Sequence, residues 1–304
     1  MFNWFVPKVF NSGYLPEQDG HKIFYMEAGN PKGQPIIVFH GGPGGSAKEK
    51  HAYPYDRKKY RIILFDQRGC GRSIPAGEFK NNTTQDLLSD VDRLLEHLNI
   101  KGKIVLSGRS WGSTLALLYA IKNPKRVEKM ILSMVFLADK QCRDWEEKYS
   151  NWFYPDIWEK IIAEIPSTDS VAKEYAKLIN SKNLVDQVKS ASLYANYERV
   201  LGCLDPKLDI QELGVDDINS AKIYINYAAK KFMLEDNEII QHIDNIKNIP
   251  TLITHNRLDL LCPLDGAWQV HKKLKKSKLV IVSDLGHYSE KLVRITNQEI
   301  KKFL

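Results

Sequence analysis

Short apolar runs recur along the chain, and stretches with the spacing of an amphipathic helix separate most of them. Apolar runs of this length are typical of buried strands, and strands that alternate with helices are typical of a largely parallel sheet with helices on both faces. The pattern therefore predicts an α/β fold built on a mostly parallel sheet. The predicted strands are residues 22–27, 36–40, 61–66, 103–107, 129–136, 251–255 and 278–283.

One long segment interrupts this alternation. Between residues 136 and 251 the chain is rich in Trp, Tyr, Lys and Glu at helical spacing, and no run in it resembles a strand. Because this insertion follows a strand, we expect it to form a helical cap over the carboxyl edge of the sheet, where such folds hold their substrates. The predicted domains are the first part of the core at 1–138, the helical cap at 139–246 and the second part of the core at 247–304.

The apolar run that begins at Ile104 ends in the sequence Gly-Arg-Ser-Trp-Gly, and a helical run follows at once. Gly-x-Ser-x-Gly between a strand and a helix is typical of a nucleophile elbow, a tight turn that lifts a serine hydroxyl clear of the sheet. A side chain at Gly108 or Gly112 would collide with neighbouring backbone. Ser110 is therefore the predicted nucleophile.

A nucleophilic serine needs hydrogen-bond donors for the oxyanion that forms during acyl transfer. The backbone N–H of Trp111, directly after the serine, is one predicted donor. The strand at 36–40 runs into the glycine-rich loop at 41–45, a sequence suited to bringing bare backbone close to a substrate. We expect the backbone N–H of Gly42 to be the second donor.

An acid and a base should follow the serine in the order Ser, Asp, His. Asp259 and His287 each come in a loop after a predicted strand, where open α/β sheets place their reactive groups. We expect His287 to be the general base and Asp259 to orient its ring. Asp284 is the rival acid, but a residue three positions before the base has little reach to orient it. His255 is expected to lie beside the triad.

The 304 residues are 43% hydrophobic, which is enough for one large core and an inserted unit. No apolar run is long enough to cross a membrane, and residues 1–8 lack the features of a signal peptide, so we expect a cytoplasmic protein without a membrane partner. The four cysteines are widely scattered, which predicts neither a disulfide framework nor a zinc site. No metal or cofactor is expected.

The formal net charge of +7 raises the question of a nucleic-acid partner. The lysines are interleaved with acids along most of the chain, and the dense basic patch at 271–278 falls on a predicted helix. A solvated helix face explains that patch better than a binding surface does. We expect no nucleic-acid partner, and the sequence predicts no particular oligomeric state.

Several longer motifs resemble those of bacterial proline iminopeptidases, which have the α/β-hydrolase fold. The resemblance runs from about Tyr14 to His287 and is densest in the first 130 residues or so. It implies a serine exopeptidase that releases an N-terminal proline from small peptides through an acyl-enzyme on Ser110, without a metal or cofactor. The motifs are His40-Gly-Gly-Pro-Gly-Gly45, Phe65-Asp-Gln-Arg-Gly-Cys-Gly-Arg-Ser73, Asn82-Thr-Thr84, Ser110-Trp-Gly-Ser-Thr-Leu-Ala-Leu117, Arg257-Leu-Asp-Leu-Leu-Cys-Pro263 and Gly286-His287.

The resemblance also implies how the substrate is bound. In the family, glutamates of the cap bind the free amine, and Glu198 matches one of them. A carboxylate that faces a buried ammonium forms a charge-assisted bond and selects free N-termini. Phe136 and Trp111 match aromatic positions that pack around the proline ring. The implied partner is a small peptide with a free N-terminus.

Three positions depart from the family pattern. Tyr224 stands where a second amine-binding glutamate is expected, and a tyrosine carries no charge near neutral pH. Arg109 replaces a glycine inside the elbow, where we expect its side chain to point toward the surface, and Ser133 replaces an arginine in the strand at 129–136. The alternative to the exopeptidase is therefore a capped esterase or amidase with altered specificity, which kept the triad and lost part of its amine anchor.

Overall fold

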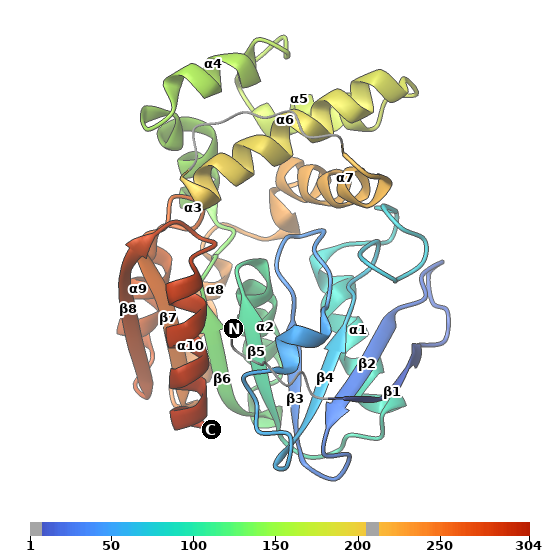
Figure 1. Cartoon of the computed structure of the whole chain (residues 1–304), viewed down its shortest axis with the longest axis vertical. Helices are drawn as coiled ribbons and strands as arrows, with labels where there is room; N and C mark the ends of the chain where they lie inside the picture. The colour runs from blue at the N-terminus through green and yellow to red at the C-terminus, as the bar shows by residue number, and fades with distance from the viewer. Residues whose placement is uncertain (1–7, 205–212) are drawn as a thin grey trace.

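The computed structural model describes residues 8–204 and 213–304, and the strands among them form a single eight-stranded sheet (Figure 1). The strands are β1 (Val9–Tyr14), β2 (Phe24–Gly29), β3 (Gln34–Phe39), β4 (Tyr60–Phe65), β5 (Ile104–Arg109), β6 (Val127–Ser133), β7 (Thr251–Leu258) and β8 (Ser277–Leu285). Their order is β1-β2-β4-β3-β5-β6-β7-β8. Strand β2 pairs antiparallel with β1 and β4, and all other neighbours pair in parallel. The predicted mostly parallel sheet is confirmed.

Each predicted strand overlaps an observed one, but the sequence analysis missed β1. This edge strand pairs only with β2, and its side chains are mostly exposed, so it lacks the apolar pattern of a buried strand. The strand predicted at 129–136 ends earlier, at Ser133, because Met134 takes a positive φ of 51° that leaves the extended region. The residues from 134 onward therefore turn away toward the cap.

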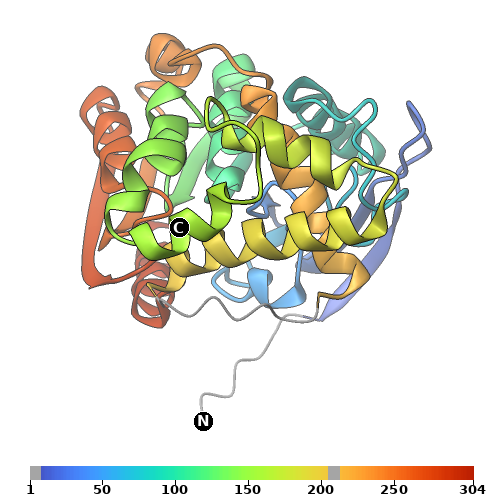
Figure 2. The ribbon, with the colours of Figure 1, turned by 90° about the horizontal axis from the view of Figure 1, so that it is seen from above.

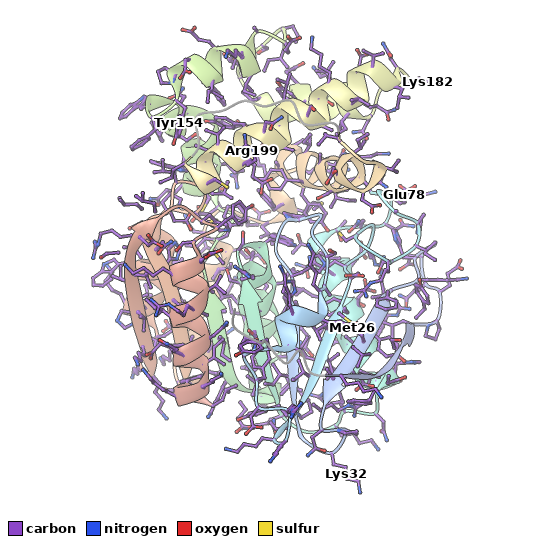
Figure 3. All side chains as sticks on the ribbon, in the orientation of Figure 1. Met26, Lys32, Glu78, Tyr154, Lys182 and Arg199 are labelled. Atoms are coloured by element: carbon purple, nitrogen blue, oxygen red, sulfur yellow. The ribbon has the colours of Figure 1, made fainter. Side chains whose placement is uncertain are left out.

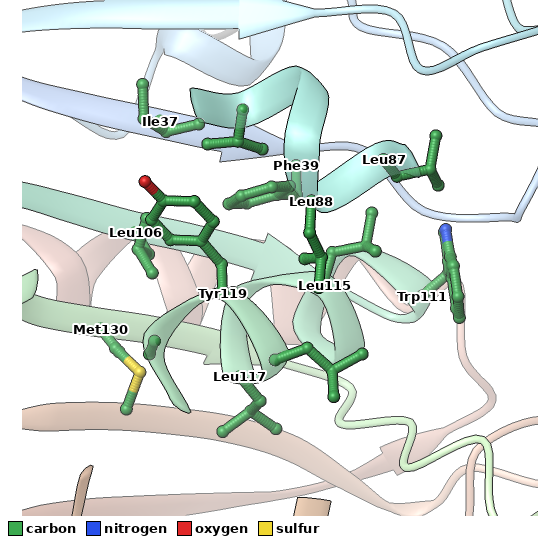
Figure 4. Close-up of a cluster of buried hydrophobic side chains, with 14 of the residues drawn as sticks. Ile37, Phe39, Leu87, Leu88, Leu106, Trp111, Leu115, Leu117, Tyr119 and Met130 are labelled. Carbon is green, nitrogen blue, oxygen red and sulfur yellow. The ribbon is translucent and has the colours of Figure 1, made fainter. Parts of the chain in front are cut away.

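Alternate residues of the central strands bury opposite faces of the sheet, as the twofold repeat of a strand requires. Ile37 and Phe39 belong to the core beneath α1, α2, α8 and α9, whereas Ile36 and Val38 belong to the core beneath α10. Figure 4 shows part of the first core, with side chains from β3, β5, α1 and α2 interleaved. The flanking helices are α1 (Thr84–His97), α2 (Trp111–Lys122), α8 (Glu238–His242), α9 (Leu264–Lys273) and α10 (Glu290–Phe303).

Local sequence explains the helices that matter most for the site. Thr83 begins α1 with a capping box, because its hydroxyl accepts from the backbone of Asp86 and the Asp86 carboxylate accepts in return from the backbone of Thr83. Helix α2 is buried on nearly all sides, which suits its apolar sequence directly after Ser110. The elbow therefore joins a buried strand to a buried helix and is held from both ends.

The long insertion forms the predicted layer of helices above the carboxyl edge of the sheet (Figures 1 and 2). It has its own apolar core, which includes Tyr175, Tyr197 and Ile225. Figure 3 places Glu78, on a loop of the core, just beneath α7. The elements of this cap are α3 (Lys140–Asp144), the π-helical turn η3 (Trp145–Tyr149), η4 (Ser150–Trp152), α4 (Pro155–Ile162), α5 (Val171–Ile179), α6 (Leu184–Cys203) and α7 (Val215–Ala229).

The remaining short helices are η1 (Glu49–Ala52), η2 (Pro124–Arg126), η5 (Lys231–Met233) and η6 (Ile243–Ile246). Helix α8 contacts α2, and Phe232 and Ile243 belong to the core of the sheet. No helix in the described part of the chain has the length and apolar character needed to cross a membrane. Residues 1–7, on which the prediction about a signal peptide mainly depends, lie outside the described residues.

Candidate active site

Ser110 lies on the tight turn between β5 and α2, with φ +53° and ψ −130°. Its backbone N–H donates to the carbonyl oxygen of Ser133 at 2.9 Å, which ties the turn to the neighbouring strand. A Cβ at Gly108 would lie 2.0 Å from the carbonyl oxygen of Gly112, and a Cβ at Gly112 would lie 2.4 Å from that of Phe39. Both flanking positions therefore require glycine, as the sequence analysis expected.

His287 and Asp259 form a buried pair beneath the cap. Nδ1 of His287 lies 2.8 Å from Oδ2 of Asp259, and each residue is only 3% exposed. The other carboxylate oxygen of Asp259 accepts from the backbone N–H groups of Leu261 and Cys262 at 3.0 and 2.8 Å. Burial opposes ionisation of Asp259, but the charge and hydrogen bond of His287 outweigh it and lower the pKa of the carboxyl. The pair leaves Nε2 of His287 as the ring nitrogen available for proton transfer.

The rival residues occupy other places. The Asp284 carboxylate accepts a hydrogen bond from the hydroxyl of Ser289, the residue that caps α10. His255 is fully buried beside the pair, with Nδ1 accepting from the backbone N–H of Val135 and Nε2 donating to the carbonyl oxygen of Cys262. That tautomer is neutral, and burial lowers the pKa of His255. It therefore braces the loop that carries Asp259.

A cavity of about 980 Å³ lies between the cap and the carboxyl edge of the sheet. Ser110 and His287 border it from the core, and the hydroxyl oxygen of Ser110 lies 4.0 Å from the sulfur of the buried Cys262. Three predicted site residues border the same cavity, namely Gly42, Glu198 and Tyr224. The structure thus brings residues that are far apart in the chain to one cavity.

Two aromatic residues of the predicted site lie in a buried cluster. Phe136 is 7% exposed and its ring packs edge-on against Phe232, with centroids 5.2 Å apart. The indole of Trp111 is fully buried against Phe232 and Tyr227. Neither residue is among those that border the cavity.

Gln67 connects the two loops predicted to hold the oxyanion. Its backbone N–H donates to Nε2 of His40 and its side-chain amide donates to the His40 carbonyl oxygen, both at 3.0 Å. Its amide oxygen accepts from the indole N–H of Trp111 at 2.9 Å. The glycine loop also lies against the nucleophile, because a Cβ at Gly41 would be 3.3 Å from that of Ser110. Nothing in the sequence marks Gln67 as a functional residue, although it lies within the motif from Phe65 to Ser73.

Glu146 is the second residue that the sequence analysis did not select. It comes from the π-helical turn η3 and lies where α6 and α7 converge. The hydroxyl of Tyr224 donates to both of its oxygens at 2.9 and 3.0 Å, and the hydroxyl of Tyr194 donates to one at 2.9 Å. Burial raises the pKa of Glu146 to about 7. In the sequence it belongs to the run Trp-Glu-Glu-Lys, which resembles a solvated helix face.

The end of α6 contacts the loop that carries the base. The carbonyl oxygen of Gly202 accepts from the backbone N–H of His287 at 2.7 Å and from that of Tyr288 at 3.2 Å. A Cβ at Gly286 would lie 2.4 Å from the same oxygen, and Gly286 has a φ of +76°. This close approach requires glycine and fixes the loop against the helix on which Glu198 lies.

The comparisons with known proteins agree with this geometry. Residues 34–289 match the sequence model of the α/β-hydrolase fold family. The chain is 37% identical to a probable proline iminopeptidase of Leptolyngbya boryana, over 91% of this chain and 88% of the relative. It is also 37% identical to a proline iminopeptidase of Arabidopsis thaliana, over 91% of this chain and 75% of the relative. A proline iminopeptidase of Xylella fastidiosa (strain Temecula1) is 35% identical over 91% of each chain.

Solved structures share the fold at much lower identity. The α/β hydrolase MGS-M2 from a Medee basin deep-sea metagenome library has a TM-score of 0.63 and 19% identity, covering 96% of each chain. An α/β-fold family hydrolase from Bacillus anthracis has the same TM-score and identity, covering 98% of this chain and all of that one. The strand order, the helical insertion and these matches confirm the expected α/β-hydrolase fold. Together with the sequence relatives, they show that the chain belongs to the proline iminopeptidase family of α/β hydrolases.

Proposed function

We propose that this protein is a serine aminopeptidase that releases an N-terminal proline from small peptides. One observation carries the proposal: Ser110 and the paired His287 border the same cavity as the carboxylate-bearing residue Glu198. A hydrolase that removes only the first residue must hold a free amine close to its nucleophile, and Glu198 supplies an acid on the wall of this cavity. The names of the sequence relatives support the same substrate.

The proposed reaction is acyl transfer through Ser110. Nε2 of His287 takes the hydroxyl proton as Oγ attacks the carbonyl carbon of the N-terminal residue, and Asp259 stabilises the imidazolium. The backbone N–H groups of Gly42 and Trp111 are the proposed donors to the oxyanion, each accounting for about 3 kcal/mol of the barrier. His287 then protonates the leaving amine, and water attacks the prolyl ester on Ser110 by the same route in reverse.

Glu198 is the proposed anchor for the substrate ammonium. Its pKa is raised by burial, an effect that the nearby His287 opposes, so its carboxylate lies within electrostatic reach of the catalytic base. An ammonium in the cavity favours the ionised carboxylate and gains a charge-assisted hydrogen bond. An N-acylated substrate carries no such charge and leaves the acid without its counter-ion. Phe136 and Trp111, which the resemblance assigns to the proline ring, do not border this cavity, so we do not assign them that contact.

The test is the release of a chromogenic amine from prolyl, alanyl and N-acetyl-prolyl anilides, with nitrophenyl acetate as a matched ester. We expect the prolyl anilide to be cleaved fastest and N-acetylation to abolish its cleavage. Ester cleavage without any prolyl preference would instead support the capped esterase or amidase. Ser110→Ala serves as the control, because activity that survives in it does not come from this site.

Three further proposals rest on the sequence. We propose a cytoplasmic location, a peptide substrate as the partner rather than a nucleic acid, and a domain division at residues 138–139 and 246–247, although the last part of this cap segment, from Phe232 to Ile246, packs with the core of the sheet. Limited proteolysis followed by mass spectrometry tests the domain division. Cleavage between domains should occur near residues 138–139 and 246–247, and the folded fragments should stay bound to each other.

A further inference from the structure

Glu146 is a carboxylate without a counter-ion. Tyr194 and Tyr224 donate to it, and the other charged groups that most affect its ionisation are the carboxylates of Glu147 and Glu198. No ion pair joins it to a cation within residues 8–204 and 213–304. Its side chain is partly exposed to solvent, but burial is the largest effect on its pKa. Buried acids of this kind are normally paired, so the site lacks a positive group.

We infer that Glu146 supplies the second negative charge of the amine site, acting with Tyr224, which stands where the family pattern has a glutamate. The inference rests on the proposed aminopeptidase function. If Glu146 has this role, the tyrosine at position 224 does not remove the second negative charge from the amine site. The carboxylate comes instead from η3, and its hydrogen bond with Tyr224 holds it beside position 224.

Two hydrogen bonds connect Glu146 to the wall of the cavity. Tyr194 and Tyr224 border the cavity and both donate to Glu146, so its carboxylate lies one hydrogen bond behind the cavity wall. Its Oε2 atom accepts only the shared hydrogen bond from Tyr224 and keeps acceptor capacity for another donor. The phenol oxygen of Tyr224, polarised by the carboxylate behind it, is also free to accept from a substrate amine.

Glu198 completes the site from α6. It influences the ionisation of Glu146, Tyr224 and Tyr288, which places it within electrostatic reach of all three. Two carboxylates on and behind the wall of one cavity repel each other when the cavity is empty, and an ammonium beside them reduces that repulsion. The pair therefore selects a free N-terminal amine over an acylated one or a neutral ester.

The groups that face Glu146 also define its response to pH. These are Glu147 on its own turn, Tyr194, Tyr197 and Glu198 on α6, Tyr224 on α7 and the thiol of Cys262 in the loop of Asp259. The tyrosines and the thiol stay neutral near pH 7, because burial raises the pKa of each. An ammonium ligand should therefore bind more tightly as Glu146 ionises, so KM for a prolyl anilide should fall as the pH rises through about 7.

The experiment compares Glu146→Gln with wild type on prolyl anilide and on nitrophenyl acetate. We expect KM for the anilide to rise roughly 10- to 100-fold, with kcat changed less than about threefold and ester hydrolysis unchanged. Glu147→Gln is the matched control, because this neighbour accepts from the backbone N–H of Ala172 and is not within the pair. An equal loss of both activities, or no change in KM, would overturn the inference.

A second variant, which places the carboxylate at position 224, tests the proposal independently if Glu146→Gln is unstable. Tyr224→Glu combined with Glu146→Gln returns a carboxylate to the family position, and we expect KM for the anilide to recover at least tenfold relative to Glu146→Gln alone. Tyr224→Phe keeps the charge but removes the hydrogen bond, so it should raise KM less than Glu146→Gln does. A folded double variant without recovery would contradict the proposal.

Inhibition by prolinamide distinguishes a failure of the proposed role of Glu146 from a failure of the proposed aminopeptidase function. Wild-type protein should bind prolinamide, measured as competitive inhibition of ester hydrolysis, and should ignore N-acetyl-prolinamide. If the wild type cleaves prolyl anilide but Glu146→Gln leaves KM and prolinamide inhibition unchanged, only the role of Glu146 fails. If the wild type hydrolyses the ester and prolinamide does not inhibit it, the proposed function fails, and the amine site with it.

Discussion

Arg109 on β5 and Ser133 on β6 are direct partners in the parallel register of the two strands. These are two of the three positions at which the sequence departs from the family pattern, an arginine in place of glycine and a serine in place of arginine. Both residues also border a second cavity of about 470 Å³ between η1 and α10. Paired side chains on neighbouring strands lie on the same face of a sheet, so the guanidinium of Arg109 lies on the same face as position 133, where the family pattern has an arginine. Arg109 is half-buried, and burial lowers its pKa, so its side chain does not simply extend into solvent as expected.

A double-mutant cycle tests whether Arg109 and position 133 are energetically coupled. Ser133→Arg alone should destabilise the protein, because it places a second guanidinium beside Arg109 in a partly buried space. Combined with Arg109→Gly, it should recover most of that loss, with a coupling of roughly 1–3 kcal/mol in the free energy of unfolding. Chemical denaturation of the four proteins measures the coupling, and additive effects would show that the two positions are independent.

The strained backbone of Ser110 predicts a difference between two inactive variants. Ser110→Ala and Ser110→Gly should each lower kcat by at least about 10⁴-fold, because both remove the nucleophile. Ser110→Gly should be the more stable of the two by roughly 1 kcal/mol, since glycine adopts a φ of +53° without a steric penalty. Thermal unfolding of the pair checks the ranking, and equal melting temperatures would mean that the turn is not strained.

Asp259 and Asp284 should differ sharply. Asp259→Asn should lower kcat by about 10⁴-fold, because it removes the charge that stabilises the His287 imidazolium and lets an amide N–H donate to Nδ1, which favours the wrong tautomer. Asp284→Asn should change kcat less than about threefold, because its contact is with Ser289 at the start of α10. Steady-state kinetics of both variants on prolyl anilide decides the assignment. A reversed ranking would make Asp284 the orienting acid.

Gln67 should act as a positioning residue. Gln67→Leu leaves the indole N–H of Trp111 and the carbonyl oxygen of His40 without their partner, at a cost of about 1–3 kcal/mol in stability. We expect kcat to fall roughly 10- to 100-fold with KM nearly constant, because the oxyanion donors act only in the transition state. Gln67→Glu keeps the acceptor for Trp111 and should retain more activity. If both variants lose stability but no kcat, the network is structural only.

Stability should depend on pH through Glu146. Burial raises the pKa of this carboxyl from 4.5 to about 7, so between these values the folded protein holds a proton that the unfolded chain has released. Stability must therefore fall as the pH rises through this window. Glu146→Gln has no titratable carboxyl, so its unfolding free energy relative to wild type should rise by on the order of 1–3 kcal/mol from pH 4.5 to pH 8, which denaturation at each pH measures. Glu159→Gln, at an exposed position of α4, is the control.

The sequence by itself determined the features that depend on near neighbours. The elbow around Ser110 follows from a strand, two glycines and a helix in immediate succession, and the backbone crowding at Gly108 and Gly112 is a local property. The strands that hold Asp259 and His287 follow from apolar runs, and strand ends in a parallel sheet meet at one edge. These positions could be predicted because the chain imposes them locally. Edge strand β1 could not, because its side chains carry no burial pattern.

Only the tertiary structure decided which distant residues act on one another. Glu146 and Tyr224 are far apart in the chain and meet because η3 and α7 fold into one cap. Arg109 and Ser133 become partners only once the register of β5 and β6 is fixed. Gln67 acquires its role when β4 places it between the loops of His40 and Trp111. Charge and polarity along the sequence do not reveal such pairs, because burial, register and the approach of a second element create their energetics.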